Sequence, residues 1–132
     1  MCFFVEIGLL NHTDAMVNCQ SQFGANSTGK LFEPRDRSTN DQVMEFAKEM
    51  ILPSGSRVRI GINDMTTEGT WQYATGGNLV YTNWANGQPN NYGGIQDCGS
   101  IWPNKYASGI WPLGTWGDVE CDILLHSICE MI

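Results

Sequence analysis

Residues 74–97 form a long stretch rich in Gly, Asn, Pro and Thr that lacks the periodicity of a helix or a strand. Two short strand patterns precede it: alternating apolar residues that end at Ile62, and then the aromatic pair Trp71 and Tyr73. A structureless loop of this length inside a compact domain needs an organiser, commonly a function or a bound ion. The sequence therefore predicts a domain with one large, organised loop.

The other segments carry helix and strand patterns within a single domain that spans residues 1–132. Thr13 is expected to cap a helix that runs to Phe23. Ser38 is expected to open a second helix that ends near Ile51. Strands are expected at residues 3–10 and near residues 98–102, 115–120 and 126–131. This order predicts an α+β fold, with a strand, two helices and then a small curled sheet.

The charge of the chain is −7 and is unevenly distributed. This acidity argues against nucleic acid as a partner. Seven of the acidic residues follow residue 60, where Lys105 is the only base. That excess is explained either by solubility or by a cation site in the second half. No apolar run is long enough for a membrane span.

Five cysteines in a chain of 132 residues indicate an oxidising compartment, and therefore a secreted, extracellular protein. A zinc site is disfavoured because there is no CxxC pair and because His12 and His126 lack ligand-like spacing. Two bridges can be drawn among five cysteines in several ways, so the residues alone leave the connectivity open. Sequons at Asn11 and Asn26 are consistent with secretion.

The order and spacing of short motifs between Gly61 and Cys129 resemble the carbohydrate-recognition domain of C-type lectins. These motifs are Gly61-Ile62-Asn63-Asp64, Thr67-Glu68-Gly69, Asn83-Trp84, Gln88-Pro89-Asn90, Asp97-Cys98, Trp116-Gly117-Asp118, Cys121 and Cys129. The resemblance implies two helices flanking small antiparallel sheets, a long loop, and the disulfides Cys19–Cys129 and Cys98–Cys121. Cys2 is then left either as a free thiol or as a bridge in a homodimer. Arg59 stands where this family often has a large ring.

The resemblance also implies a Ca²⁺ site that organises the long loop. Its ligands would be Asp64, Glu68, Asn91 and Asp97, with an oxygen of Gln96. Carboxylates and an amide suit calcium, which takes six to eight oxygens. The alternative is that Asp64 and Glu68 only shape and cap a turn.

A second family site, which binds both calcium and sugar, is altered in this chain. Its positions are Gln88, Asn90, Gln96, Gly117 and Asp118, of which only Asp118 is a carboxylate. Fewer carboxylates weaken calcium binding. The resemblance also implies a cis Gln88–Pro89 bond. Gln-Pro-Asn matches neither the mannose-type nor the galactose-type motif of the family. Tyr92 could stack on a sugar or pack the loop, and it tilts the prediction slightly toward galactose-type sugars.

The sequence is therefore compatible with two classes of binding function. The first is an extracellular, calcium-assisted lectin that binds glycans. The second is a lectin-like domain that has lost sugar chelation and binds a protein or a surface. The unusually long connection 99–115, with Trp102 and Trp111, either contacts a ligand or folds back over the sheet. An enzyme is not expected: Ser127, His126 and Asp122 cannot form a triad, because adjacent residues on one strand point to opposite faces.

Overall fold

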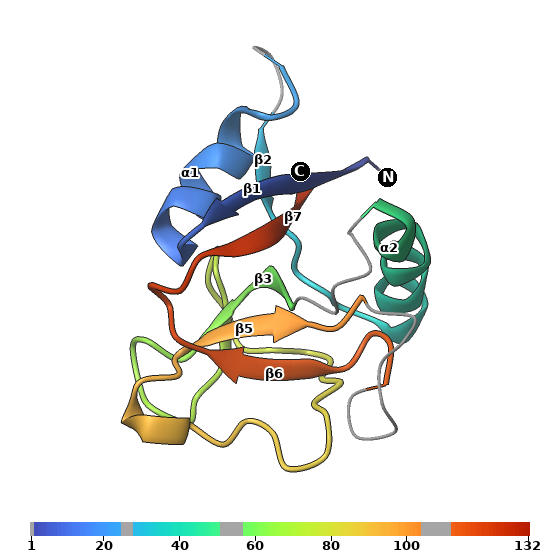
Figure 1. Cartoon of the computed structure of the whole chain (residues 1–132). Coiled ribbons are helices and arrows are strands. Elements are labelled where there is room, and N and C mark those ends of the chain that lie inside the picture. Colours follow the sequence, from blue (N-terminus) through green and yellow to red (C-terminus); the bar gives the residue numbers. More distant parts are fainter. Residues whose placement is uncertain (1, 25–27, 51–56, 104–111) are drawn as a thin grey trace.

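The computed structural model describes residues 2–24, 28–50, 57–103 and 112–132. Figure 1 shows two helices packed beside a sheet, with one large loop at the end of the molecule away from the chain termini. The elements in chain order are β1 (Phe3–Leu10), α1 (His12–Ser21), β2 (Gly29–Leu31), α2 (Arg37–Met50), β3 (Val58–Asn63), β4 (Gln72–Tyr73), the 3-10 helix η1 (Tyr92–Gly94), β5 (Cys98–Ile101), β6 (Trp116–Val119) and β7 (Leu125–Met131). The predicted α+β fold is confirmed.

The strands form one seven-stranded sheet in the order β1-β7-β3-β5-β6, with β2 paired to β7 and β4 paired to β3. The β3–β7 pair is parallel, with Arg59 opposite Ser127, whereas the other strand pairs are antiparallel. The sheet is therefore continuous and mixed, an arrangement that the strand patterns alone did not predict. The first and last strands are neighbours, so both termini lie on the same side of the molecule (Figure 1).

Both helices begin slightly earlier than the sequence predicted. Asn11, rather than Thr13, caps α1, because its side-chain oxygen accepts a hydrogen bond of 2.8 Å from the N–H of Asp14. Asp36 does the same for α2, accepting from the N–H of Thr39 at 2.7 Å. Asn and Asp are strong capping residues, and their neighbouring Thr and Ser competed for the same role in the sequence.

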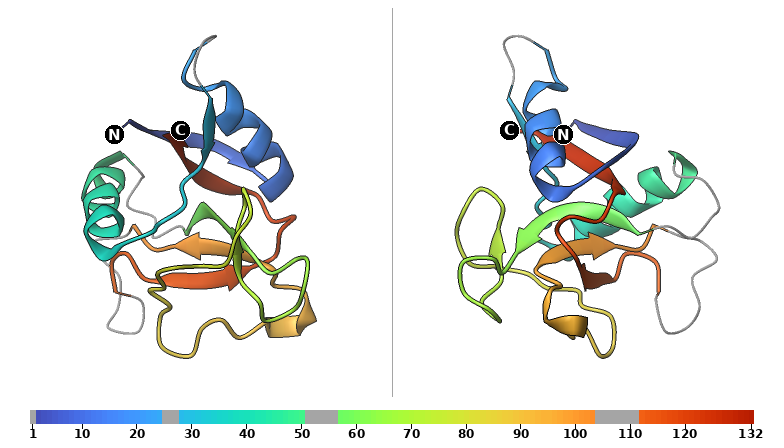
Figure 2. Two further views of the ribbon diagram at one scale, coloured as in Figure 1. Left: turned by 180° about the vertical axis from the view of Figure 1, so that it is seen from behind. Right: turned by 60° about the vertical axis from the view of Figure 1, so that its left-hand side comes forward.

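The core lies between α2 and one face of the sheet. Its buried members are Val5, Phe32, Val43, Met44, Ala47, Val58, Ile60, Ile62, Tyr73, Ile101, Trp116 and Ile128. Trp71 and Trp84, expected in the core, are partly buried against it, and their rings lie 4.8 Å apart. Figure 2 shows from two further directions how α2 covers the sheet while α1 lies against the first strands. The apolar face of α2 and the sheet thus supply most of the burial that stabilises the fold.

The two disulfides are those that the family resemblance implied. Cys19–Cys129 joins α1 to β7, and Cys98–Cys121 joins β5 to the turn before β7. The chain-entropy model gives about 4–5 kcal/mol for the first bridge and about 3 kcal/mol for the second. Cys2 is free and exposed.

Within the described residues, no helix is both long and apolar enough to cross a membrane. Trp102, in the long connection 99–115, is half-buried, and its ring lies 5.0 Å from the Arg57 guanidinium. Trp111 lies outside the described residues.

Candidate functional site

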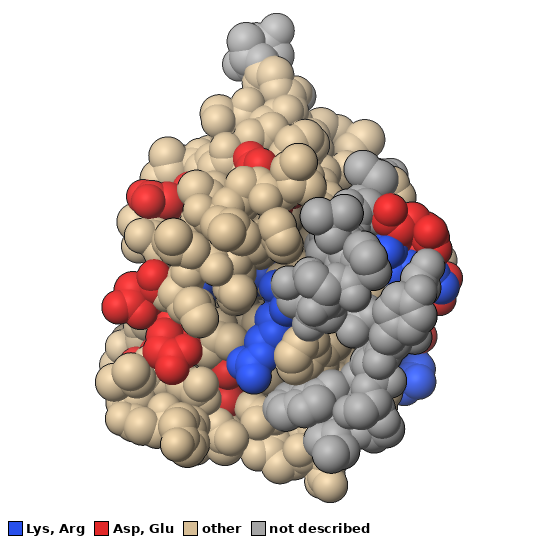
Figure 3. Space-filling model, in the orientation of Figure 1, with Lys and Arg blue, Asp and Glu red and all other residues tan. Residues whose placement is uncertain are grey.

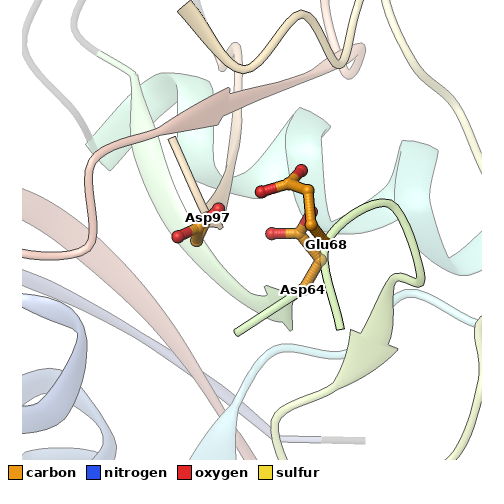
Figure 4. Close-up of side chains that lie close together, drawn as sticks. All are labelled: Asp64, Glu68 and Asp97. Carbon is orange, nitrogen blue, oxygen red and sulfur yellow. The ribbon is translucent and has the colours of Figure 1, made fainter. Parts of the chain in front are cut away.

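Three carboxylates meet where the long loop leaves and rejoins the sheet. Asp64 directly follows β3, Glu68 lies in the turn beyond it, and Asp97 directly precedes β5. One carboxylate oxygen from each side chain lies within 4.8 Å of the others. Figure 4 shows that the three side chains come from two separate chain segments and lie close together. This acidic cluster contains three of the ligands that the sequence predicted for calcium.

The local backbone explains why these residues meet. The N–H of Asp64 donates to the carbonyl of Asp97 at 3.0 Å, which joins the two segments. Oδ2 of Asp64 accepts from the N–H of Gly69 at 2.8 Å and so closes the turn that carries Glu68. Gly69 has a φ of +83°, a conformation that favours glycine. Asn63 adds a further contact, since its side-chain oxygen accepts from the N–H of Met65 at 3.1 Å.

The electrostatics of the acidic cluster favour a cation. Burial raises the pKa of Asp64, and the neighbouring Asp97 carboxylate raises it further. The pKa of Glu68 is raised to about 7, chiefly by its hydrogen bond with Asp64 and then by desolvation and by Asp97. Oδ1 of Asp64 and Oδ1 of Asp97 are buried, and neither has a hydrogen-bond partner in the part of the chain that the structure describes. Buried acceptors without donors, beside like charges, match the needs of a bound Ca²⁺.

The other two predicted calcium ligands take part in the backbone of the loop. Asn91 accepts from the N–H of Gln96 through its side-chain oxygen at 3.0 Å. Gln96 in turn accepts from the N–H of Tyr92 at 3.1 Å. Asn91 also adopts a left-handed conformation with φ of +46°. These bonds fold the turn around η1, and calcium ligation by Asn91 and Gln96 stays a prediction.

Asp118 holds the loop against the sheet. Its buried carboxylate accepts from the N–H of Asn90 at 3.1 Å and from the N–H of Asn91 at 2.6 Å. Its own N–H donates to the side-chain oxygen of Gln88 at 3.3 Å. The Gln88–Pro89 bond is cis, as the resemblance implied. Both carboxylate oxygens of Asp118 are therefore used by the protein itself, and Gly117 beside it offers no side-chain ligand. A second calcium ion fits these residues poorly.

The long loop exposes the aromatic ring of Tyr92, the aliphatic side chains of Val80 and Ile95, and polar side chains. Tyr92 is 76% exposed, so it does not pack the interior of the loop. The side-chain oxygen of Asn90 accepts from the N–H of Tyr92 at 3.2 Å. Within the described residues, no hydrogen bond occupies the amide NH₂ groups of Gln88, Asn90 and Gln96. Four of the five residues that were expected to bind carbohydrate thus lie in the long loop, and the fifth, Asp118, lies in β6 and is hydrogen-bonded to that loop.

Sequence reasoning missed a buried carboxylate that anchors the start of the loop. The Glu33 side chain is fully buried and accepts hydrogen bonds from both the N–H and the hydroxyl of Thr75. Lys30 at 3.0 Å and Arg35 at 3.1 Å neutralise its charge. Thr75 is far from Glu33 in the sequence, so no local spacing signalled this contact. On the face shown in Figure 3, a short basic stripe runs near the middle, with acidic side chains beside it and toward both edges.

The family model for the lectin C-type domain matches residues 9–131, almost the whole chain. The chain belongs to the C-type lectin domain family. Collectin-10 of Xenopus tropicalis is 31% identical over 123 residues, which cover 92% of this chain and 38% of collectin-10. Pulmonary surfactant-associated protein D of Sus scrofa is 34% identical over 105 residues, which cover 77% of this chain and 24% of that protein. The lectin domain thus spans less than two-fifths of these relatives.

Solved structures agree with this assignment. The C-type lectin CEL-I from Cucumaria echinata superposes with a TM-score of 0.83 at 22% identity, covering 99% of this chain and 89% of CEL-I. Human lithostathine gives a TM-score of 0.79 at 22% identity, covering 97% of this chain and 81% of that one. At this identity the likeness establishes the fold of the lectin domain.

This C-type lectin domain is a binding module and not an enzyme, in keeping with its family. The residues considered for a catalytic triad lie in different environments. The Ser127 side chain is buried, while Nδ1 of His126 lies 2.7 Å from the carbonyl of Ile7. Asp122 is exposed in the turn before β7.

Proposed function

We propose that this lectin domain binds glycans outside the cell, with calcium helping to shape the loop that contacts the sugar. The observation that carries the proposal is the acidic cluster of Asp64, Glu68 and Asp97 at the two ends of the long loop. Family membership supports carbohydrate as the ligand class. Two disulfides and a sequence similar to collectin-10 support an extracellular location.

Calcium in the acidic cluster would supply positive charge and oxygen coordination there. Asp64, Glu68 and Asp97 would hold it, and Asn91 and Gln96 are the further ligands that the family resemblance implies. The protein's own part is to bring the three carboxylates together despite their repulsion. Because the cluster joins the residues before and after the loop, neutralising it favours the closed loop over open alternatives.

The sugar would bind on the outward face of the loop, through Gln88, Asn90, Tyr92 and Gln96. Amide NH₂ groups donate hydrogen bonds to sugar hydroxyls, while an exposed ring stacks on an apolar sugar face. Asp118 would act by holding this loop in place, because its carboxylate already accepts two backbone N–H groups. The exposed ring of Tyr92 supports galactose-type sugars slightly over mannose-type sugars.

A second candidate function is binding to a protein or surface ligand without sugar chelation. It is favoured by Asp118, whose carboxylate is turned inward, and by Gly117, which replaces a side-chain ligand. A calcium ion that coordinates sugar hydroxyls directly has few ligands available here. Under this alternative the acidic cluster still orders the loop, but the exposed face of the loop recognises a different partner.

A glycan array with and without EDTA separates the two functions. The lectin proposal expects binding to galactose-terminated glycans that EDTA removes. Tyr92→Ala is expected to remove it as well, whereas Phe46→Ala, which truncates an exposed ring on α2, is the matched control and is expected to leave binding intact. If calcium raises the melting temperature of the protein but no glycan on the array is bound in the presence of calcium, the result would favour the alternative.

Single-site sugar binding is weak, and linking copies raises avidity. Cys2 is exposed at the start of β1 and could link two lectin domains into a homodimer. Non-reducing electrophoresis tests this link: a dimer band that reducing agent and Cys2→Ser both remove would support it. A protein that runs as a monomer under oxidising conditions would contradict it.

A further inference from the structure

Arg59 lies in the interior with most of its hydrogen-bonding capacity unused. It is 0% exposed, in the middle of β3. One of its terminal nitrogens, Nη2, donates to the carbonyl of Ile123. The other two donor nitrogens, Nε and Nη1, are buried and have no hydrogen-bond partner among the described residues. A guanidinium presents five N–H donors, and buried donors are almost always satisfied.

Two more buried polar side chains that lack a hydrogen-bond partner within the described part of the chain lie near Arg59. Ser127 is opposite Arg59 in the parallel β3–β7 register, and its hydroxyl is buried without a partner. His12 begins α1, is 1% exposed, and has neither ring nitrogen in a hydrogen bond. Its backbone N–H donates to the carbonyl of Cys121 at 2.9 Å. His12 and Arg59 are thus both tied to the turn between Cys121 and Ile123.

The charge of this group is uncompensated inside the protein. Burial lowers the pKa of Arg59 to about 10, so the guanidinium stays charged at neutral pH, and Asp122 opposes that shift. Asp122 is exposed to water. Burial lowers the pKa of His12 to about 4, with Arg59 contributing, so the imidazole is neutral. In the described ranges, therefore, no buried carboxylate lies beside this buried positive charge, an arrangement that is costly without a counter-ion.

We propose that Arg59, His12 and Ser127 form an internal site for a small monovalent anion, of which chloride is the probe. Nε and Nη1 of Arg59, the Ser127 hydroxyl and the N–H of the neutral His12 ring supply donors. The first turn of α1 adds favourable dipole charge. Water would satisfy these donors but leave the charge uncompensated. Residues 122–124 are exposed, so the ion reaches the guanidinium without crossing the apolar core.

Thermal unfolding tests the site at constant ionic strength, with gluconate replacing chloride and calcium supplied as gluconate. Raising chloride from none to about 200 mM is expected to raise the melting temperature by about 4 °C, because an ion that binds only the folded state stabilises it. Arg59→Met is expected to lose this rise. Arg37→Gln is the charge-matched control, because Arg37 is largely exposed on α2, and it is expected to keep the rise.

A second pair of measurements covers the case in which Arg59→Met does not fold. Ser127→Ala removes only one donor and is expected to reduce the chloride-dependent rise by at least half. Crystals grown in sodium bromide are expected to show an anomalous peak beside Nε and Nη1 of Arg59. Bromide crystals with only water at this position, or a melting temperature that is the same in chloride and gluconate, would overturn the proposal.

Discussion

The backbone N–H of Asp64 donates to the carbonyl of Asp97 at 3.0 Å, across the neck of the long loop. This bond places two carboxylates, one from each end of the loop, beside each other. Whatever neutralises them acts on both ends of the loop at once. Folding of the sheet and ordering of the loop are therefore coupled through a few atoms.

Calcium is expected to stabilise the domain through this cluster. An ion present at about one hundred times its Kd adds about 2.7 kcal/mol to the free energy of unfolding. Asp64→Asn is expected to abolish the effect, because it removes charge while keeping an acceptor for the N–H of Gly69. Calorimetric scans in calcium and in EDTA measure it. Glu49→Gln, an exposed acid on α2, is the control, and an equal calcium response in both variants would contradict the assignment.

Asp118→Ala is expected to loosen the long loop, which we propose as the sugar site, and to remove saccharide binding while leaving the fold. The change leaves the N–H groups of Asn90 and Asn91 without their acceptor, which costs about 1–3 kcal/mol for each that stays buried. Hydrogen exchange at these two amides should accelerate, while the amides of β7 should exchange at the wild-type rate. Unchanged protection at both loop amides would show that Asp118 does not hold the loop.

Glu33→Ala is expected to destabilise the domain by about 3 kcal/mol, because it removes a fully buried carboxylate that pairs with Lys30 and with the half-exposed Arg35 and that accepts from Thr75. Urea unfolding measures the loss. Thr75→Val removes two of the contacts to Glu33 without disturbing the ion pairs, and should cost less than half as much. A larger loss of stability for Thr75→Val than for Glu33→Ala would show that the contact with the loop is the main role of Glu33.

Acid is expected to destabilise the domain through His12. Its pKa is about 4 when folded and near 6.5 when unfolded, so the unfolded chain binds the extra proton between these values. This contribution is complete above pH 6.5 and is lost as the pH falls to about 4, by an amount on the order of 3 kcal/mol. The charge of Arg59 contributes to this lowered pKa, and Asp122 in turn acts on Arg59. Urea midpoints in chloride-free buffer should fall less steeply with pH for His12→Phe than for the wild type. If the urea midpoints of the variant and the wild type fell equally with pH, His12 would not be the source of the acid sensitivity.

The sequence alone predicted the strands and helices closely, because apolar periodicity is local information. It missed which residue caps each helix, since Asn11 and Asp36 lie next to other good capping residues. It could not pair Glu33 with Thr75 or Arg59 with Ser127, because such contacts depend on register across the sheet. The disulfides and the acidic cluster followed from family resemblance rather than from spacing. The hydrogen bonds that the Asp118 carboxylate accepts from the loop could not be predicted either, because a sequence motif does not show which donors lie near a carboxylate.

The pairing of β1 with β7 has a practical consequence for anyone who wishes to display this domain. Both chain ends emerge at one pole, and the long loop occupies the other (Figure 1). A fusion partner, a biotin tag or a stalk attached at either end would leave the long loop, which we propose as the recognition surface, pointing into solution. Sensor chips and multivalent scaffolds can therefore be built from either terminus.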